Sequence, residues 1–349
     1  MDLFQYIGYL GLRIPISSNQ LLTPHEDVTI ISATLGEEDD YLDTVATWLI
    51  VKPKAIIIVT VDAAVSRITD VISKLGDERI LLFTVTKPDI RKQLTKGIQN
   101  TTTKLIVLVD DDSRWSPQTL RYLISAFQNP FVGGVNTAQT VRPRSTRFTL
   151  WESFGALNLV RRNILHSTVA YFNKGQVLNL SGRTVAYRTA ILKNNEFYEA
   201  FLNDYWRGKH LIKTGDDSFI TSWIVRRGWD TVFLNQPDGA IVTTVNHDVT
   251  YLKQVLRWSR DTGRHYWRDL LFAVRTCQPR LCIRSFLNCI CNYTTDFSVV
   301  GELGFLIVLS ARTPYESDGT RLNAHRLDLD SLVNIETVYI IANTKPGYG

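Results

Sequence analysis

The 349-residue sequence contains few cysteines and no long uncharged apolar segment. Its four cysteines all lie between residues 277 and 291, at a spacing that fits no zinc template well, so we interpret them as free thiols in a reducing compartment. A membrane-spanning helix needs about 18 or more consecutive apolar residues. The nearest candidate, residues 286–311, is interrupted by Asp296 and Glu302. Residues 1–12 are apolar but too short for a signal peptide, and they lack its basic start and cleavage site.

Glycine motifs that bind dinucleotides or nucleoside triphosphates are also missing, because neither GxGxxG nor GxxxxGK[ST] occurs. The 39 basic and 34 acidic residues give a net charge of +5, which is too mild to indicate nucleic acid, and we expect no such partner. Aromatic residues are plentiful by contrast. Eight tryptophans and 14 tyrosines suit stacking on sugars or a position at a membrane interface, although ordinary core packing uses them too.

Apolar strands alternate with helices through the first 130 residues. Buried strands are expected at residues 28–36, 54–62, 79–85 and 104–110, with a helix between each pair. This alternation predicts an α/β fold with a mostly parallel sheet that helices cover on both faces. Ligands of such sheets bind beyond the carboxyl ends of the strands, which is where Asp62 is expected.

Three consecutive aspartates, Asp110, Asp111 and Asp112, follow the fourth strand in the stretch LIVLVDDDSRWSP. One Asp or Ser at this place can cap a helix that starts near Pro117. A cap needs only one such side chain, however, and adjacent carboxylates repel one another. A divalent cation would remove that repulsion, so the triplet indicates a site for Mn²⁺ or Mg²⁺.

A second acidic pair, Asp216 and Asp217, follows Gly215 at the start of an expected helix. One of the two can cap the helix while the other faces a cleft. A neighbouring carboxylate raises the pKa of its partner, which suits a general base. About 40 residues on, residues 251–272 form an expected helix with arginines on one stripe and large aromatics on another. This pattern is typical of a helix at a membrane surface, and a solvated amphipathic helix is the alternative.

Taken in order, the D-x-D, G-D-D and Q-x-x-R-W motifs resemble those of the processive family-2 glycosyltransferases, the group of hyaluronan, chitin and cellulose synthases. The resemblance is strongest to hyaluronan-synthase-like polysaccharide synthases of fungal type, and it covers roughly residues 25–270. It implies a GT-A-like mixed, mostly parallel sheet flanked by helices, followed by an interfacial helix and a short membrane-associated segment. The family's S-G-P-x-x-x-Y-R stretch corresponds to SGRTVAYR here, with Arg183 in place of the proline.

The resemblance also assigns roles to individual residues. The positions implied to bind the nucleotide-sugar are Asp62, Arg91, Lys92, Asp110 and Arg257. Those implied to hold the metal are Asp112 and Asp110, and the catalytic base is Asp217. The positions implied to bind the acceptor are Ser181, Gly182, Asp216, Gln254 and Trp258.

The predicted organisation is a lead segment (1–24), a glycosyltransferase domain (25–250, with a nucleotide half 25–135 and an acceptor half 136–250), the Q-x-x-R-W helix (251–272), an apolar membrane-associated segment (273–311) and a polar tail (312–349).

The expected function is inverting, metal-dependent transfer from a UDP-sugar to a growing polysaccharide or other glycan acceptor. The expected location is a membrane, with the catalytic domain cytosolic and a lipid surface as a partner, and a membrane protein could supply the polymer channel. The alternative is a non-catalytic or truncated paralogue that binds nucleotide-sugar or a synthase partner. A metal-dependent phosphohydrolase would leave Gln254, Arg257 and Trp258 unexplained.

Overall fold

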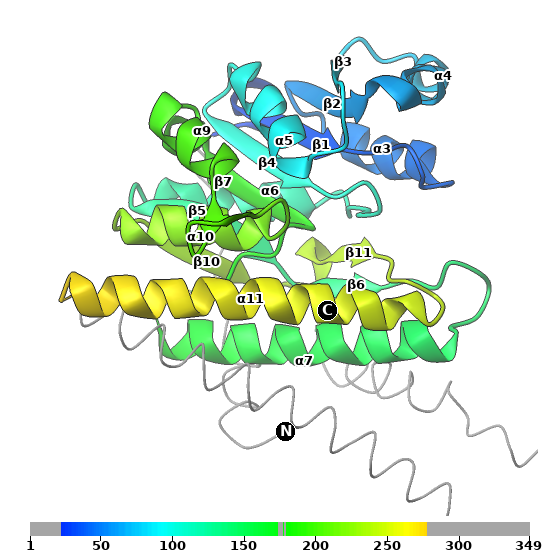
Figure 1. Cartoon of the computed structure of the whole chain (residues 1–349). Coiled ribbons are helices and arrows are strands. Elements are labelled where there is room, and N and C mark those ends of the chain that lie inside the picture. Colours follow the sequence, from blue (N-terminus) through cyan, green and yellow to red (C-terminus); the bar gives the residue numbers. More distant parts are fainter. Residues whose placement is uncertain (1–21, 174–176, 178, 278–349) are drawn as a thin grey trace, which may run out of the picture.

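The computed structural model describes residues 22–173, 177 and 179–277, and its centre is a seven-stranded sheet (Figure 1). The strand order is β10-β5-β7-β4-β1-β2-β3. β7 runs antiparallel to both β4 and β5, whereas the other neighbouring pairs are parallel. The strands are β1 (Val28–Ala33), β2 (Ala55–Val61), β3 (Ile80–Val85), β4 (Leu105–Val109), β5 (Val132–Thr137), β7 (Thr184–Arg188) and β10 (Asp230–Leu234). The predicted mixed, mostly parallel α/β sheet is therefore confirmed.

Helices cover both faces of this sheet, because the central strands are apolar on both sides. Every residue of β4 is buried, as expected for a strand between two helical layers. One core cluster joins the sheet to α3 (Tyr41–Ile50), α4 (Val65–Leu75) and α6 (Thr119–Ser125). The opposite cluster joins it to α5 (Ile90–Gln99), α8 (Thr189–Leu192), α9 (Asn195–Leu202) and α10 (Asp216–Arg226). The short helix α2 (Pro24–Asp27) leads into β1.

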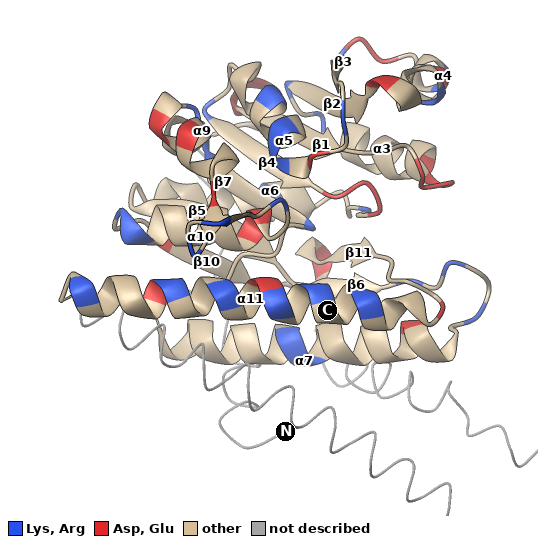
Figure 2. Ribbon diagram, viewed as in Figure 1, with Lys and Arg blue, Asp and Glu red and all other residues tan. Residues whose placement is uncertain are grey.

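Two long helices, α7 (Leu150–Phe172) and α11 (Thr250–Arg275), lie side by side below the sheet in Figure 1. A third apolar cluster joins them through Leu159 of α7 and Tyr251 of α11. α7 begins with a capping box in which Thr149 and Glu152 bond each other's main chain. α11 includes the whole predicted helix 251–272. Figure 2 shows its many basic residues.

Two small two-stranded sheets accompany the main sheet. β6 (Gln139–Val141) pairs in parallel with β11 (Ile241–Thr243), and β8 (Tyr205–Trp206) forms a hairpin with β9 (His210–Leu211). Three short 3₁₀ turns complete the described elements: η1 (Asp62–Ala64), η2 (Ala126–Gln128) and η3 (Pro237–Gly239).

The prediction of a membrane-associated protein is contradicted. No helix within residues 22–277, as far as they are described, is both long enough and apolar enough to cross a bilayer. α7 and α11 have sufficient length, but α7 carries Glu152, Arg161 and Arg162, and charged residues recur through α11. The apolar segment predicted at 273–311 lies outside the described residues beyond Cys277, as do the tail 312–349 and most of the lead segment 1–24.

Candidate active site

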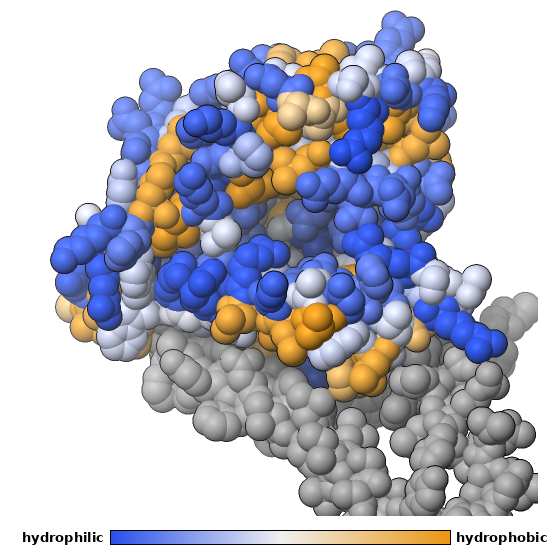
Figure 3. All heavy atoms as spheres, turned by 45° about the vertical axis from the view of Figure 1, so that its right-hand side comes forward, coloured by the Kyte–Doolittle hydropathy of each residue, from blue (hydrophilic) through white to orange (hydrophobic). Residues whose placement is uncertain are grey.

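The acidic triplet after β4 and the acidic pair at the start of α10 lie close enough for their charges to interact. The charge of Asp216 raises the pKa of Asp110, although the two residues are distant in sequence. Figure 3 shows a hollow in this face of the molecule, with mostly hydrophilic residues around it. The parallel strands β1, β2 and β4 all end on this side of the sheet, which is where α/β proteins bind ligands.

Asp110 lies where β4 meets the start of β7. Its main-chain N–H donates to the carbonyl oxygen of Arg183 (3.1 Å), which extends the β4–β7 ladder by one residue. Its side chain is reached by solvent, yet protein surrounds it on most sides. This environment raises the pKa of Asp110 well above the usual range, first through desolvation and then through the charges of Asp112 and Asp216, with Arg183 acting in the opposite direction. A bound cation would favour the ionised form.

Asp111 is attached to the loop that follows β1. The Thr34 hydroxyl donates to Oδ2 of Asp111 (2.6 Å) and itself accepts from the Gly36 N–H (2.8 Å). Burial raises the pKa of Asp111 to about 7, with the charges of Asp112 and Glu38 adding to the rise and the Thr34 hydrogen bond opposing it. No separate role was predicted for Asp111. The structure uses it to link the ends of β1 and β4.

Asp112 is held by the last residue of β11 and by the residue that follows it, far along the chain. Its Oδ2 accepts from the hydroxyls of Thr243 and Thr244 (both 2.9 Å) and from the Thr244 N–H (3.2 Å). Its Oδ1 accepts only a long hydrogen bond from the Ser113 hydroxyl (3.3 Å). The side chain is thus oriented through one oxygen, while the other keeps lone pairs for a further ligand.

These carboxylates fit a cation that is shared with a phosphate. Among the described residues, no group of three or more His, Cys, Asp or Glu side chains is arranged to hold a metal by itself. Mg²⁺ is commonly held by one or two carboxylates together with substrate phosphates, and Asp110 and Asp112 supply that oxygen set. Besides desolvation, the negative charges of Asp112 and Asp216 raise the pKa of Asp110, and a bound cation would offset them.

At the start of α10, Asp217 is fixed by main-chain donors. Gly215 has a φ of 64°, a left-handed conformation that suits glycine and turns the chain into the helix. Oδ2 of Asp217 accepts from the Gly182 N–H (3.1 Å), and Oδ1 accepts from the Ser218 N–H (2.6 Å) and hydroxyl (3.3 Å). The sequence predicted that one of the two aspartates could cap the helix. Asp217 is the one whose side chain accepts from the Gly182 and Ser218 N–H groups.

Asp216 lies beside these groups in a different electrostatic environment. Burial raises its pKa to about 6, with a further rise from the charge of Asp217. A main-chain hydrogen bond and the positive charges of Arg91 and Arg257 act in the opposite direction. The charges of Arg91 and Arg257 thus favour the ionised form of Asp216, whereas burial and the charge of Asp217 favour its protonated form.

Arg91 differs most from its predicted role as a nucleotide-binding residue. It is only 2% exposed, and its guanidinium donates to the carbonyl oxygens of Phe201 (2.8 Å) and Thr214 (3.0 Å) and to Oδ2 of Asp204 (3.0 Å). Rings of Phe201 and Phe219 lie 5.0 and 5.1 Å from its Cζ. With both terminal nitrogens occupied, Arg91 anchors the loop before Gly215 and is not free to contact a nucleotide.

The other predicted nucleotide contacts stay at the surface. Asp62 is exposed immediately after β2, at the carboxyl end of that strand, and Lys92 is exposed on α5. Arg257 is exposed on α11, and its charge reaches Asp216. Their positions leave all three available to a ligand.

The predicted acceptor residues have mixed environments. Gln254 accepts from the Asn246 N–H (3.3 Å) and so fixes the loop before α11. Trp258 is half-buried, and the Cζ of Arg183 lies 4.9 Å from its ring centroid. One ring face is therefore used within the protein. Ser181 is buried next to Gly182, whose N–H is bound to Asp217.

A network of ion pairs lies beside Thr244, which also binds Asp112, and no local pattern in the sequence predicted it. Arg144 donates to both carboxylate oxygens of Glu38 (2.9 and 3.1 Å) and to the Thr244 hydroxyl (3.1 Å). Asp40 binds both Arg114 (2.9 Å) and Arg142. The loop after β1 is thereby joined to the segment after β6.

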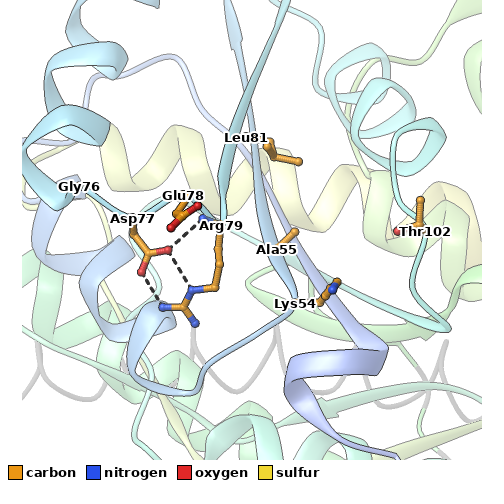
Figure 4. A pocket seen from close by; sticks show the side chains of 8 residues that line it. All are labelled: Lys54, Ala55, Gly76, Asp77, Glu78, Arg79, Leu81 and Thr102. Atoms are coloured by element: carbon orange, nitrogen blue, oxygen red, sulfur yellow. Dashed lines mark hydrogen bonds and ion pairs between the residues drawn. The ribbon is translucent and has the colours of Figure 1, made fainter.

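A separate hollow of about 670 Å³ lies at the opposite end of the sheet (Figure 4). It is lined by Lys54, Arg79 and Thr102, which precede β2, β3 and β4. Arg79 is paired with Asp77 there (2.6 Å). Because the hollow is at the amino ends of parallel strands and contains none of the acidic motifs, we do not assign the active site to it.

Comparison with known proteins identifies relatives over most of the described chain. The family model "Glycosyltransferase like family 2" matches residues 24–261. A "Type 2 glycosyltransferase" of Zymoseptoria tritici is 34% identical over 275 residues, covering 76% of this chain and 58% of that protein. A "Type 2 glycosyltransferase" of Pyricularia oryzae is 30% identical over 261 residues, covering 74% and 53%. The "NDP-glycosyltransferase ltbB" of Aspergillus luteorubrus is 30% identical over 251 residues, covering 69% and 61%.

The chain spans roughly half to three-fifths of the length of these curated relatives. Among solved structures, S. aureus TarS (1–349) is similar with a TM-score of 0.45 and 13% identity, covering 70% of this chain and 65% of that one. GalNAc-T7 with UDP, GalNAc and Mn²⁺ is similar with a TM-score of 0.42 and 12% identity, covering 63% and 43%.

Proposed function

This chain belongs to glycosyltransferase family 2, and we propose that it transfers a sugar from a UDP-sugar to a hydroxyl group of a glycan acceptor. The observation that carries the proposal is the juxtaposition of the β4 carboxylates with the carboxylate pair of α10. Transfer requires negative phosphate oxygens to be held on one side of the anomeric carbon and a base on the other. Two acidic groups that face one cleft suit these two tasks.

The donor diphosphate would lie against the end of β4. Asp112 and Asp110 would hold a divalent cation, and Asp62 and Lys92 would contact the nucleoside. A bound Mn²⁺ or Mg²⁺ supplies positive charge that neutralises the diphosphate as it leaves. Arg257 adds donors to the same oxygens, because a guanidinium binds phosphate through two parallel N–H groups. The orientation of Asp112 by Thr243 and Thr244 supports this assignment.

Asp217 is the proposed base. Its carboxylate is oriented by the Gly182 and Ser218 N–H groups, and a carboxylate has about four acceptor positions, so capacity remains for a proton. The acceptor oxygen loses its proton to this carboxylate and bonds to the anomeric carbon. The bond to the diphosphate oxygen breaks, and its electron pair leaves with UDP. A single displacement of this kind inverts the anomeric configuration.

Asp216 is a second candidate for the same role. Its pKa of about 6 lies close to the working pH of most enzymes, where a base is most effective. It also faces Arg257, which belongs to the donor side. The paired substitutions considered in the Discussion separate the two candidates.

The acceptor of polysaccharide-synthase type is a narrower proposal. It rests on the Q-x-x-R-W sequence of α11, whose Arg257 acts on the charge of Asp216 and whose Trp258 contacts Arg183, the residue before β7. A phosphohydrolase would have no use for this helix. The hyaluronan-synthase-like specificity has no further support from the contacts described above.

The function can be tested by a screen of UDP-sugars for UDP release in the presence of Mn²⁺ or Mg²⁺. UDP-glucose, UDP-N-acetylglucosamine and UDP-glucuronic acid cover the main donor types. We expect at least one to be turned over and the chelator EDTA to abolish the turnover. If the folded protein binds UDP with Mn²⁺ but releases UDP from no donor, the proposed function is wrong and the non-catalytic alternative that binds nucleotide-sugar is preferred; if it does not bind UDP either, both are wrong.

A further inference from the structure

Thr244 links the carboxylate of Asp112 to the guanidinium of Arg144. The Thr244 hydroxyl donates to Oδ2 of Asp112 (2.9 Å), and the hydroxyl oxygen accepts from Nη2 of Arg144 (3.1 Å). A guanidinium can only donate hydrogen bonds, and a hydroxyl group has a single hydrogen. Because Arg144 donates to the hydroxyl oxygen, the one hydrogen of Thr244 is directed at Asp112.

Arg144 is itself held in place from two sides. Its guanidinium binds both carboxylate oxygens of Glu38 (2.9 and 3.1 Å), and its main-chain N–H donates to Oε1 of Glu152 (2.8 Å). Glu152 is buried in the first turn of α7, and Glu38 lies in the loop between β1 and α3. The contacts of Glu38 and Arg144 continue through Thr244 to Asp112, and we call this chain of four residues the Thr244 relay. It connects the loop after β1 to the acidic triplet.

The hydrogen bonds to Asp112 are concentrated on one of its two oxygens. Oδ2 accepts from both threonine hydroxyls and from the Thr244 N–H, whereas Oδ1 accepts, among the described residues, only the 3.3 Å bond from Ser113. The Thr243 hydroxyl also lies 3.4 Å from the carbonyl oxygen of Thr244, so its single hydrogen is shared between two acceptors. Thr244 is only 2% exposed, so water has little access to its hydroxyl. It is therefore the more firmly directed of the two side-chain donors.

A purely structural role for the Thr244 hydroxyl is the alternative. Thr140 of β6 shows such a role, because its hydroxyl donates to the main-chain carbonyl oxygen of Ile241 in the neighbouring strand β11 (3.2 Å). A hydroxyl of that kind contributes to stability through one hydrogen bond. Thr244 differs, because its acceptor is a carboxylate of the proposed metal site and its own oxygen is bound by a charged donor.

We propose that Thr244 is a positioning residue for the donor site, which fixes Asp112 through Oδ2 and so leaves Oδ1 available to the divalent cation. Arg144 and Glu38 act through Thr244 by fixing the direction of its hydroxyl group. This inference rests on the proposed function, because the cation is the one that binds the donor diphosphate. Loss of a side chain that hydrogen-bonds a metal ligand commonly lowers metal affinity by about 10- to 100-fold.

The test measures how much Mn²⁺ strengthens the binding of UDP to the full chain. Calorimetry gives the UDP affinity with and without Mn²⁺, and we call the ratio of the two affinities the metal gain. Thr244→Val removes the hydroxyl without changing the charge. We expect the metal gain to fall about 10-fold, the lower end of the range, because the Thr243 hydroxyl and the Thr244 N–H still reach Asp112. UDP affinity without metal should stay unchanged, and Thr244→Ser, which keeps a hydroxyl, should restore most of the gain.

A second variant tests the rest of the Thr244 relay. Arg144→Met is combined with Glu38→Gln, because loss of the arginine alone would also remove a positive charge that repels the cation. The double variant keeps the net charge and leaves the Thr244 hydroxyl without a fixed direction. We expect its metal gain to fall by about 3-fold, since part of one hydrogen bond is lost. Thr140→Val is the matched control, because it removes a threonine hydroxyl that bonds to the main chain of β11, and it should keep the full metal gain.

An unchanged metal gain in folded Thr244→Val would overturn the inference. So would a loss that Thr140→Val shares, or one that Thr244→Ser fails to restore, since a structural effect would then be responsible. Melting temperatures show whether each variant is folded. If Thr244→Val is not, the double variant decides: a reduced metal gain supports the relay, and an unchanged one refutes it.

Failure of the proposed function gives a different result. In that case the wild type releases UDP from no donor, whereas the metal gain can still be measured, because it depends on binding alone. A wild type that binds UDP with no gain from Mn²⁺ overturns the inference and the metal assignment, and the release of UDP from a UDP-sugar then shows whether sugar transfer itself stands.

Discussion

The main-chain N–H of Gly182 donates a hydrogen bond of 3.1 Å to Oδ2 of Asp217. This contact joins the turn before β7 to the first turn of α10, two segments that the sequence assigned separately to acceptor binding and to the base. The β7 turn is also bonded to β4 through Arg183 and Asp110. The donor-side carboxylates and the base are therefore connected by one short stretch of main chain, so their separation is fixed by the sheet.

If Asp112 holds the metal, the Asp112→Asn variant should lose affinity for UDP in the presence of Mn²⁺. Oδ1 of Asp112 is the oxygen left for a cation, and an amide is a weaker ligand than a carboxylate. We expect the affinity for UDP with Mn²⁺ to fall by at least about 10-fold, or roughly 1.4 kcal/mol, without a change in melting temperature beyond a few degrees. Calorimetry with UDP in the presence and absence of Mn²⁺ measures this difference. Asp111→Asn, whose side chain is bound to Thr34, is the control and should retain metal-dependent binding. Unchanged affinity in Asp112→Asn would refute the assignment.

Arg91 should contribute to stability and not to nucleotide binding. Breaking a buried ion pair costs about 3–5 kcal/mol when one charge is left behind. In Arg91→Met we expect the lower end of that range, about 3 kcal/mol, because Asp204 also pairs with Arg268 (2.5 Å). Chemical denaturation measures the change in the free energy of unfolding. The neighbouring exposed residue gives the control, and Lys92→Met should be nearly neutral for stability. A folded Arg91→Met variant that loses UDP affinity while keeping its stability would show that our interpretation is wrong.

These cases show what the sequence can and cannot predict. The strand before Asp110 and the helix containing Gln254, Arg257 and Trp258 are local patterns, so their periodicity was sufficient to predict them. The contacts of Asp112 come from Thr243, 131 residues away, and from its neighbour Thr244. Such partners depend on the packing of β11 against the end of β4, and no local pattern encodes them.

The role inferred for Arg91 from its position in the sequence does not agree with how the residue packs. Arg91 occupies the position of a ligand-binding residue, yet it lies between Phe201 and Phe219 and binds Asp204. These partners come from α9 and α10 and the loop between them. A basic residue on an expected amphipathic helix gives no sign in advance that aromatic rings from distant segments will enclose it.

The raised pKa of Asp216 predicts that the stability of the protein depends on pH. Its pKa is raised from 3.8 to about 6 in the folded protein, so ionisation is less favourable there than in the unfolded chain. The unfolded state then binds fewer protons than the folded state between these values, and this group lowers the free energy of unfolding as pH rises from about 4 to about 6. Above pH 6 its contribution is constant. Melting temperatures of the wild type and Asp216→Asn across this range test the sign. The substitution removes this negative contribution, so the slope of melting temperature against pH should be more positive in the variant, and a more negative slope in the variant would contradict the prediction.

Substitution of Asp217 is expected to lower turnover and to leave the affinity for the donor unchanged. In Asp217→Asn the amide can still accept from the Gly182 N–H, but it cannot take the acceptor proton. We therefore expect turnover to fall by about 10²- to 10⁴-fold, the usual contribution of general base catalysis. The affinity for UDP should stay nearly the same, because the base faces the acceptor. The melting temperature should also fall modestly, since the main-chain donors at the start of α10 bond to Asp217.

Asp216→Asn is the matched comparison, because it removes one negative charge from the adjacent position. The maximal rate should fall far less than in Asp217→Asn. If Asp216→Asn instead loses turnover by several orders of magnitude while Asp217→Asn stays active, then Asp216 is the base and its pKa of about 6 is the functional one. If both variants of an active enzyme keep normal turnover, proton removal depends on neither residue, and the base must be sought elsewhere in the cleft.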